Sequence, residues 1–589
     1  MKHKRQKNRN NKMFEKVFTV LKASALFLLL SSTLILIITN LLFVFNITIT
    51  PYHLPIIYVF TTLGYMVWKK KEWKKAIIAI AIASVVFIGC AYAATKTYDG
   101  TPDGNTYHKL AVGALKNGWN PLYESVGDFN KKEGNPFDVY KDNVNVNWVD
   151  HYARGTETFG AVVYAFSGNI ETGKMFNLLW IYIGLFIIFG LLKQMNLNNW
   201  KSLLIAIILA FNPIMLVQIA NYYLDGVLAI SLFIIILCCL LQFKKLSPEE
   251  SKMNYLILGM AIIWCCNAKF TGLAFAAVFC GVYYLYKHIK NYIKDKNNFK
   301  KKFIKDTIFY VVTVLIAVLV VGGSTYTKNM IDHGNPLYPL YGKGHVDNMV
   351  MMEIPKSLQD KNRLTIFLTS IFAKGENVSP SYSDEGNEPD LKVPLTFTQE
   401  ELDNYSIPDI RMGGFGPLFS AIFILSIIGT ICIIVEYIRN KNWNQLIPYI
   451  ITLGLIACLI LFLDGGYWSR YIPYFYLVPA FVLIHYLQKE FKAHKVANIF
   501  ALVIVIIFIV NSGLIFRTQY HSIIGNNEYV QIRIDRFKTY ANENKNKKIL
   551  INLQHHGIQG VQYNIDDLGV KNYKLTDKKQ ENDGYMFTY

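Results

Sequence analysis

Two carboxylates, two tyrosines and a histidine lie close together in residues 98–108, directly after a long apolar segment. They are Asp99, Asp103, Tyr98, Tyr107 and His108. A carboxylate in such a place can act as a general base on a hydroxyl group, provided that burial or a second carboxylate raises its pKa. The alternative is that the two aspartates only form turns, as aspartate, glycine and proline commonly do. The spacing alone leaves both interpretations open.

Further polar residues stand at the ends of apolar segments. His151 and Tyr152 belong to an aromatic and charged stretch over residues 148–157, and Asp225 opens a strongly apolar run. An ionisable residue at the mouth of an apolar helix is a candidate functional residue. The alternatives are an aromatic belt at the membrane interface for residues 148–157 and a helix N-cap for Asp225.

Two isolated cations have a similar placement. Lys269 and Arg470 lie in the motifs 267–272 and 466–473, between apolar segments. If both face the side of the acidic motifs, they can hold a phosphate group, which arginine grips with its planar fork. The alternative is that each side chain snorkels to lipid headgroups.

The elements that must position these residues are apolar helices. The chain has 589 residues, of which 52% are hydrophobic and 17% charged, and its mean hydropathy is +0.25. Such a composition is too apolar for a soluble domain. The net charge of +19 comes largely from short lysine runs between apolar stretches, which is typical of positive-inside topology. We therefore expect membrane lipids, and not nucleic acid, as partners.

The hydropathy pattern predicts an all-α polytopic membrane protein with about thirteen transmembrane helices, because about 20 apolar residues cross a bilayer as a helix. The pair around Asn267 is short enough to be a hairpin that does not cross fully. The predicted segments are 18–46, 54–68, 75–94, 174–192, 201–219, 225–242, 253–266, 270–287, 303–323, 415–438, 445–463, 470–487 and 495–516.

This pattern divides the chain into a membrane domain, residues 1–516, and a polar tail, residues 517–589. With the basic N-terminus inside, two large loops, residues 95–172 and 324–413, face the extracytoplasmic side together with the C-terminus. A strand-like run over 548–553 indicates that the tail is a small α/β appendage. We expect localisation in the cytoplasmic membrane.

The eight cysteines all lie in apolar segments, where a thiol behaves as a small hydrophobic group. We therefore expect neither disulfides nor structural zinc. No ligand spacing indicates a metal site or any cofactor, although a divalent cation is compatible with the sequence.

Taken in order, these motifs resemble the multi-span glycosyltransferases of the GT-C class, which include protein O-mannosyltransferases and the aminoarabinose lipid A transferase. The resemblance covers roughly residues 1–490 and lies in these runs: 103–108, 118–121, 151–152, 222–226, 269–272, 335–339 and 468–473. The family often has two adjacent acidic residues in the first outer loop. Here Asp99 and Asp103 are four positions apart.

The resemblance implies an enzyme that moves a sugar from a polyprenyl-phosphate donor to a glycan, lipid or protein acceptor at the outer membrane face. Asp103 matches the family's catalytic base best, and Asp99 is the competitor. Lys269 and Arg470 are expected to stabilise the departing phosphate. Asp225 and His151 are expected to orient hydroxyl groups, and the neighbouring Tyr107, His108 and Tyr152 to bind substrate.

Two other classes of function fit parts of the pattern. A transporter or flippase of lipid-linked sugars is expected to place charged residues inside the spans, along its pathway. A structural or assembly protein would use its outer loops to bind partners. The crowding of polar groups in two outer loops favours an enzyme that works at the membrane surface.

Overall fold

The computed structural model describes residues 2–132, 144–294, 296–346, 354–377, 388–490, 493–551 and 560–575. Parts of both predicted outer loops and of the predicted appendage therefore lie outside the described residues. These parts are 133–143, 347–353, 378–387, 552–559 and 576–589, and they include the last two residues of the strand predicted over 548–553.

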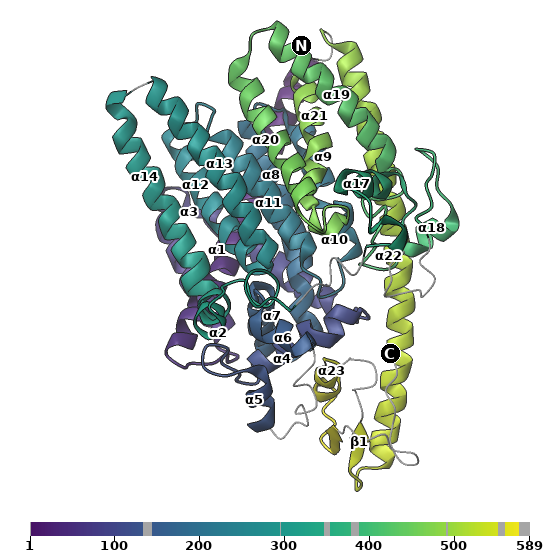
Figure 1. Ribbon diagram of the computed structural model, residues 1–589. Coiled ribbons are helices and arrows are strands. Elements are labelled where there is room, and N and C mark those ends of the chain that lie inside the picture. Colours follow the sequence, from purple (N-terminus) through teal and green to yellow (C-terminus); the bar gives the residue numbers. More distant parts are fainter. Residues whose placement is uncertain are drawn as a thin grey trace.

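The described chain is an all-α membrane protein with a small α/β piece near its C-terminus (Figure 1). Each of the thirteen predicted segments coincides with helical residues, while the number of membrane crossings stays a prediction. Eight helices in the described ranges are long and apolar enough to cross a membrane: Met13–Val44, Lys70–Ala94, Ile170–Gln194, Phe270–Lys294, Phe299–Val321, Phe419–Arg439, Trp443–Phe462 and Lys495–Glu543.

The N-terminal half consists of three helices, a helical first loop and a central bundle. The first helices are α1 (Lys2–Val44), α2 (His53–Trp68) and α3 (Trp73–Ala94). The loop holds η2 (Gly104–His108), α4 (Lys109–Lys116), α5 (Val126–Lys132), α6 (Val144–His151), α7 (Gly155–Ser167) and η4 (Ile170–Met175). The bundle holds α8 (Phe176–Gln194), α9 (Asn199–Ala210), α10 (Pro213–Val217), α11 (Asp225–Leu241), α12 (Pro248–Ala268), α13 (Phe270–Lys294) and α14 (Lys296–Leu315) with η5 (Ile316–Val321).

The C-terminal half begins with the second loop. This loop holds η6 (Gly323–Thr327), α15 (Lys328–His333), η7 (Lys356–Leu358), α17 (Arg363–Phe372) and α18 (Gln399–Asn404). The remaining elements are α19 (Phe419–Arg439), α20 (Trp443–Phe462), η8 (Ser469–Tyr471), η9 (Pro473–Tyr476), α21 (Leu477–Gln488), α22 (Lys495–Glu543), β1 (Ile549–Ile551), α23 (Val561–Asp567) and β2 (Tyr573–Leu575).

Helices α8 and α11 form the centre of the bundle. Nearly every side chain of α11 is buried, and this helix packs against α8, α12 and α13. Helices α3, α14, α19 and α22 instead carry exposed apolar side chains, among them Val85, Val311 and Ile431. A continuous apolar surface on long helices is stable in lipid but not in water. The outer helices therefore face the bilayer.

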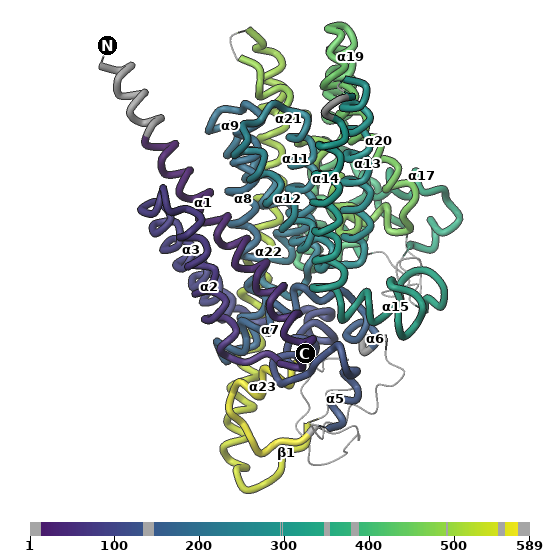
Figure 2. The backbone as a smooth tube through the Cα atoms, turned by 90° about the vertical axis from the view of Figure 1, so that its left-hand side faces the viewer, coloured from purple at the N-terminus to yellow at the C-terminus, as the bar shows by residue number. Residues whose placement is uncertain are grey.

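The short basic connections gather at one end of the bundle. Lys201 Nζ donates to the carbonyl of Lys489 at 3.3 Å, and Lys290 Nζ donates to Asn444 Oδ1 at 2.9 Å. These contacts join four connections that the predicted topology places on the cytoplasmic side: 193–201 with 488–495, and 288–302 with 439–444. The first loop and the C-terminal piece lie at the opposite end (Figure 2). The structure thus separates a lysine-rich end from an end with long loops, as the positive-inside pattern predicts.

The C-terminal piece is anchored to the first loop. β1 and β2 pair in parallel, with Ile549 opposite Tyr573, and the strand predicted near residue 548 is confirmed over β1. Helix α22 runs through residue 516, so that the predicted domain boundary falls inside one helix. The amide of Gly560 donates to the carbonyl of Asn105 at 2.7 Å, and Asn564 Oδ1 accepts from Lys109 Nζ at 2.9 Å.

Glycine permits a close approach of α23 to α4. A Cβ atom at Gly113 would lie 2.1 Å from the Tyr563 ring, a contact that a side chain cannot make. We predict that Gly113→Ala displaces α23 and destabilises this contact by about 1–3 kcal/mol through overpacking. Limited proteolysis should then cleave the segment after Glu543 faster than in the parent protein. Gly127→Ala is the matched control, because its Cβ meets only Ser125 Oγ at 3.7 Å; equal cleavage of both variants would contradict the prediction.

Candidate active site

A buried arginine gathers three carboxylates from distant parts of the chain. Arg470 Nε lies 3.0 Å from Asp225 Oδ2, Arg470 Nη1 lies 2.5 Å from Asp409 Oδ1, and Arg470 Nη2 lies 3.6 Å from Asp103 Oδ2. Lys269 Nζ reaches the other oxygen of Asp225 at 2.7 Å. Four residues singled out in the sequence therefore share one ion cluster, which also contains Asp409, a residue that sequence reasoning missed.

Asp225 is held in place by its own segment. Gln218 Nε2 donates to Asp225 Oδ2 at 2.9 Å, and Gln218 Oε1 accepts from the amide of Gly226 at 2.9 Å. The Asp225 side chain is fully buried and makes no N-cap hydrogen bond. It begins α11 as the acceptor of two cations and one amide. The capping alternative therefore does not describe this residue.

The two cations are enclosed by aromatic rings. The Arg470 guanidinium lies 4.8 Å from the Tyr223 ring and 5.2 Å from the Trp468 ring, and Lys269 Nζ lies 4.0 Å from the Tyr471 ring. Only 10% of the Arg470 side chain and 14% of the Lys269 side chain are exposed. Neither side chain snorkels, because both are buried and paired with carboxylates.

Asp103 is the accessible carboxylate of this cluster. Its side chain is 24% exposed, whereas that of Asp225 is completely buried. Tyr107 lies one turn further along and lines the same cavity. Burial and the nearby Asp103 charge raise the pKa of Tyr107 well above its usual value, so that the phenol stays protonated. Asp103 thus faces the cavity near a neutral phenol and a buried arginine.

The cavity beside this cluster has aromatic walls. Tyr107 stands edge-on to Trp148 at 5.0 Å between ring centroids, and Tyr152 stands edge-on to Phe270 at 5.2 Å. Aromatic faces of this kind can pack against an apolar face of a ligand, and a sugar ring has such a face. The lining also includes the following residues: Asp103, His108, Val149, Arg154, Glu157, Tyr223, Lys269, Asp409, Trp468, Arg470 and Tyr471.

Arg154 is the cation that sequence reasoning missed. Its side chain lines the cavity, and the residue is only 4% exposed. Nη2 donates to the carbonyls of Asp150 at 2.7 Å and Ser324 at 3.1 Å. Its Nε and Nη1 atoms are buried without a hydrogen-bond partner in the part of the chain that the structure describes. Burial lowers the pKa of Arg154 to about 10, against the opposite effect of the Asp150 and Glu157 charges.

A buried histidine and glutamate complete the lining. His108 Nδ1 lies 2.6 Å from Glu157 Oε1, and Glu157 Oε2 accepts from Thr156 Oγ1 at 2.8 Å. Both side chains of the pair are about 5% exposed. His108 was singled out in the sequence. Glu157 was not, although its position three residues after Arg154 puts both side chains near one face of the start of α7.

Three residues singled out in the sequence do not line this cavity. Asp225 is fully buried and contacts the lining residues Lys269 and Arg470. Asp99 accepts hydrogen bonds from its own turn and from a distant segment. Oδ1 accepts from the amide and hydroxyl of Thr101 at 2.8 and 2.6 Å, and Oδ2 accepts from the amide of Tyr222 at 2.7 Å. His151 Nδ1 lies 2.8 Å from Asn329 Oδ1. Of the two aspartates in the first loop, the geometry favours Asp103 for contact with a substrate.

The described residues hold no group of three histidine, cysteine, aspartate or glutamate side chains that could bind a metal ion.

Comparison with protein-family profiles, curated proteins and solved structures found no match to this chain. The side chains around the cavity are therefore the basis for assigning a function.

Asp225 should contribute more to stability than Asp103 does. Asp225→Asn leaves two buried cations short of one negative charge, and we expect a loss of about 3–5 kcal/mol in the free energy of unfolding. Asp103→Asn should lose less than about 1 kcal/mol, because Asp103 is partly exposed and more distant from Arg470. Thermal unfolding in detergent measures both variants. An equal loss in the free energy of unfolding of both variants would show that burial does not decide how much these carboxylates contribute to stability.

Proposed function

We propose that this chain is a membrane glycosyltransferase with a GT-C-like architecture. It moves a sugar from a polyprenyl-phosphate donor to a hydroxyl group of a cell-envelope acceptor at the outer face of the cytoplasmic membrane. The observation that carries the proposal is that a partly exposed carboxylate, Asp103, and a buried arginine, Arg154, line the same aromatic cavity. This cavity is lined by both predicted outer loops, away from the lysine-rich end of the bundle.

The proposed chemistry is an inverting displacement at the anomeric carbon. Asp103 takes the proton of the acceptor hydroxyl while the acceptor oxygen bonds to the anomeric carbon. The bond from that carbon to the phosphate oxygen breaks, and the lipid phosphate leaves with the electron pair. The aromatic walls are suited to hold the sugar ring between the two groups.

The charges around the cavity favour different roles for its arginines. Arg470 is already surrounded by three carboxylates, so that its charge is balanced without a ligand. Arg154 instead forms no ion pair with a carboxylate among the described residues, and two of its buried nitrogen atoms, Nε and Nη1, have no hydrogen-bond partner there. A buried N–H group without an acceptor costs about 1–3 kcal/mol, which a phosphate oxygen would recover. In this proposal Arg154 binds the donor phosphate, while Arg470 and Lys269 hold the carboxylates in place.

The first test concerns the base. Asp103→Asn should reduce sugar transfer in proteoliposomes by about 10²–10⁴-fold, because the side chain can no longer accept the proton. Asp128→Asn is the matched control: Asp128 belongs to the same loop, and its side chain is 63% exposed. Full activity of the Asp103 variant would remove this residue from the role. Movement of the lipid-linked sugar across the bilayer without any new glycosidic bond, in the parent protein, would instead favour a flippase.

The second test concerns the phosphate. Arg154→Gln should raise the apparent KM for the lipid-phosphate donor by about 10–100-fold and leave the KM for the acceptor nearly unchanged, because one charged hydrogen bond to phosphate is lost. Arg154→Lys should recover part of the donor affinity by keeping the charge. Initial rates at varied donor and acceptor concentrations separate the two constants. An equal rise in both would contradict phosphate binding by Arg154.

A further inference from the structure

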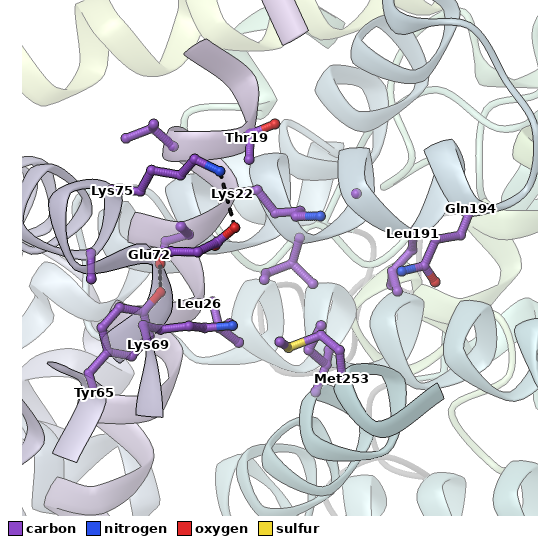
Figure 3. A pocket seen from close by; sticks show the side chains of 16 residues that line it. Thr19, Lys22, Leu26, Tyr65, Lys69, Glu72, Lys75, Leu191, Gln194 and Met253 are labelled. Carbon is purple, nitrogen blue, oxygen red and sulfur yellow. Dashed lines mark hydrogen bonds and ion pairs between the residues drawn. The ribbon is translucent and has the colours of Figure 1, made fainter. Parts of the chain in front are cut away.

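A second cavity lies at the lysine-rich end of the bundle, between α1, the α2–α3 turn, α8 and α12 (Figure 3). Three lysines line it, Lys22, Lys69 and Lys75, together with one acidic residue, Glu72. Lys75 Nζ lies 3.1 Å from Glu72 Oε1, so that the single acidic residue is already paired. The cavity therefore keeps two positive charges that its own lining does not balance.

Lys22 is placed to use its charge inside this cavity. A Cβ atom at Gly190 would lie 2.5 Å from Lys22 Cδ, which shows that the lysine stem lies directly against α8. Within the described ranges no hydrogen bond or ion pair joins Lys22 Nζ to another side chain. The nearby Glu250 carboxylate is bound to the amide of Ser247 at 2.9 Å as part of the α12 capping box. The amine groups of Lys22 and Lys69 both point into the cavity (Figure 3).

The rest of the lining suits an amphiphile. Gln194 Oε1 is buried without a hydrogen-bond partner in the described part of the chain, and it is thus free to accept from a headgroup hydroxyl. Besides the charged residues, the cavity wall is apolar, with Leu26, Ile187, Leu191 and Ile257. A free inorganic anion would gain nothing from this apolar wall, whereas an acyl chain would be stabilised by it.

We propose that this cavity binds an anionic phospholipid of the leaflet at the lysine-rich end. Its phosphate lies between Lys22 and Lys69, a headgroup hydroxyl donates to Gln194, and an acyl chain follows the apolar wall between α1 and α8. Basic pockets between membrane helices bind lipid headgroups through this combination of charge and apolar contact. The site is separate from the candidate active site and does not depend on the proposed transfer reaction.

The test uses the purified full-length chain in detergent and native mass spectrometry. Phosphatidylglycerol should bind, phosphatidylcholine with the same acyl chains should bind more weakly, and inorganic phosphate should not displace the bound lipid. In the double variant Lys22→Gln, Lys69→Gln, phosphatidylglycerol should bind about tenfold more weakly, because two charges near the phosphate are lost. Lys71→Gln is the matched control, since Lys71 belongs to the same turn and does not line the cavity.

Several outcomes would overturn the proposal. Equal binding of the two lipids, unchanged binding by the double glutamine variant, or displacement of the lipid by inorganic phosphate would each do so. Lys22→Arg with Lys69→Arg keeps the charges and should keep the binding. If the glutamine variant does not fold, the parent protein still provides a test: binding of phosphatidylglycerol, but not of phosphatidylcholine, should weaken as the salt concentration rises.

Discussion

The guanidinium group of Arg470 is the interaction on which the arrangement of the candidate site depends. It lies between Asp103 of the first loop, Asp225 at the start of α11 and Asp409 of the second loop. A buried charge is stable only when it is paired, and each carboxylate here belongs to a different part of the chain. The pairing therefore fixes the two loops relative to the central helix, and the cavity lies between the segments that it joins.

The proposals for both ends of the bundle depend on which buried cations form an ion pair with a carboxylate and which do not. Arg470 and Lys269 form ion pairs with carboxylates, whereas Arg154 in the active-site cavity and Lys22 at the lysine-rich end form none among the described residues, although carboxylates lie in their neighbourhood. In a medium of low dielectric constant an unbalanced charge attracts a mobile counterion strongly. The two proposed phosphate sites follow from this single physical difference, at opposite ends of the same bundle.

The C-terminal segment takes part in shaping the first loop. Helix α22 extends well beyond the length needed to cross a bilayer and brings α23 back to α4 and η4. Asp567 Oδ1 accepts from the Tyr164 hydroxyl at 2.7 Å, and Asp567 Oδ2 accepts from the amide of Ile170 at 2.6 Å. The loop that carries Asp103 is thus supported by residues 397 and 403 positions away from their partners.

The amino-acid sequence by itself determined that most of the chain lies in lipid and that its elements there are helices. Long apolar runs must be helical in lipid, and lysine-rich connections indicate which loops share an end, so the helices and the separation of the two ends were predictable. Its motifs also pointed to Asp103, Asp225, Lys269 and Arg470, because ionisable residues at the mouths of apolar helices are costly unless they have partners.

Only the tertiary structure decided which polar residues meet. Asp99 and Asp103 have the same chemistry and are four positions apart, yet Asp99 accepts from the backbone amides of Thr101 and Tyr222 and Asp103 faces the cavity. Asp409 had no signal that distinguished it from other charged loop residues, and Arg154 lay in the stretch 148–157 without a pattern that set it apart from its neighbours, since the significance of both lies in contacts across long stretches of chain. Pairing, burial and the absence of a partner are properties of three-dimensional neighbours, and a linear pattern contains none of them.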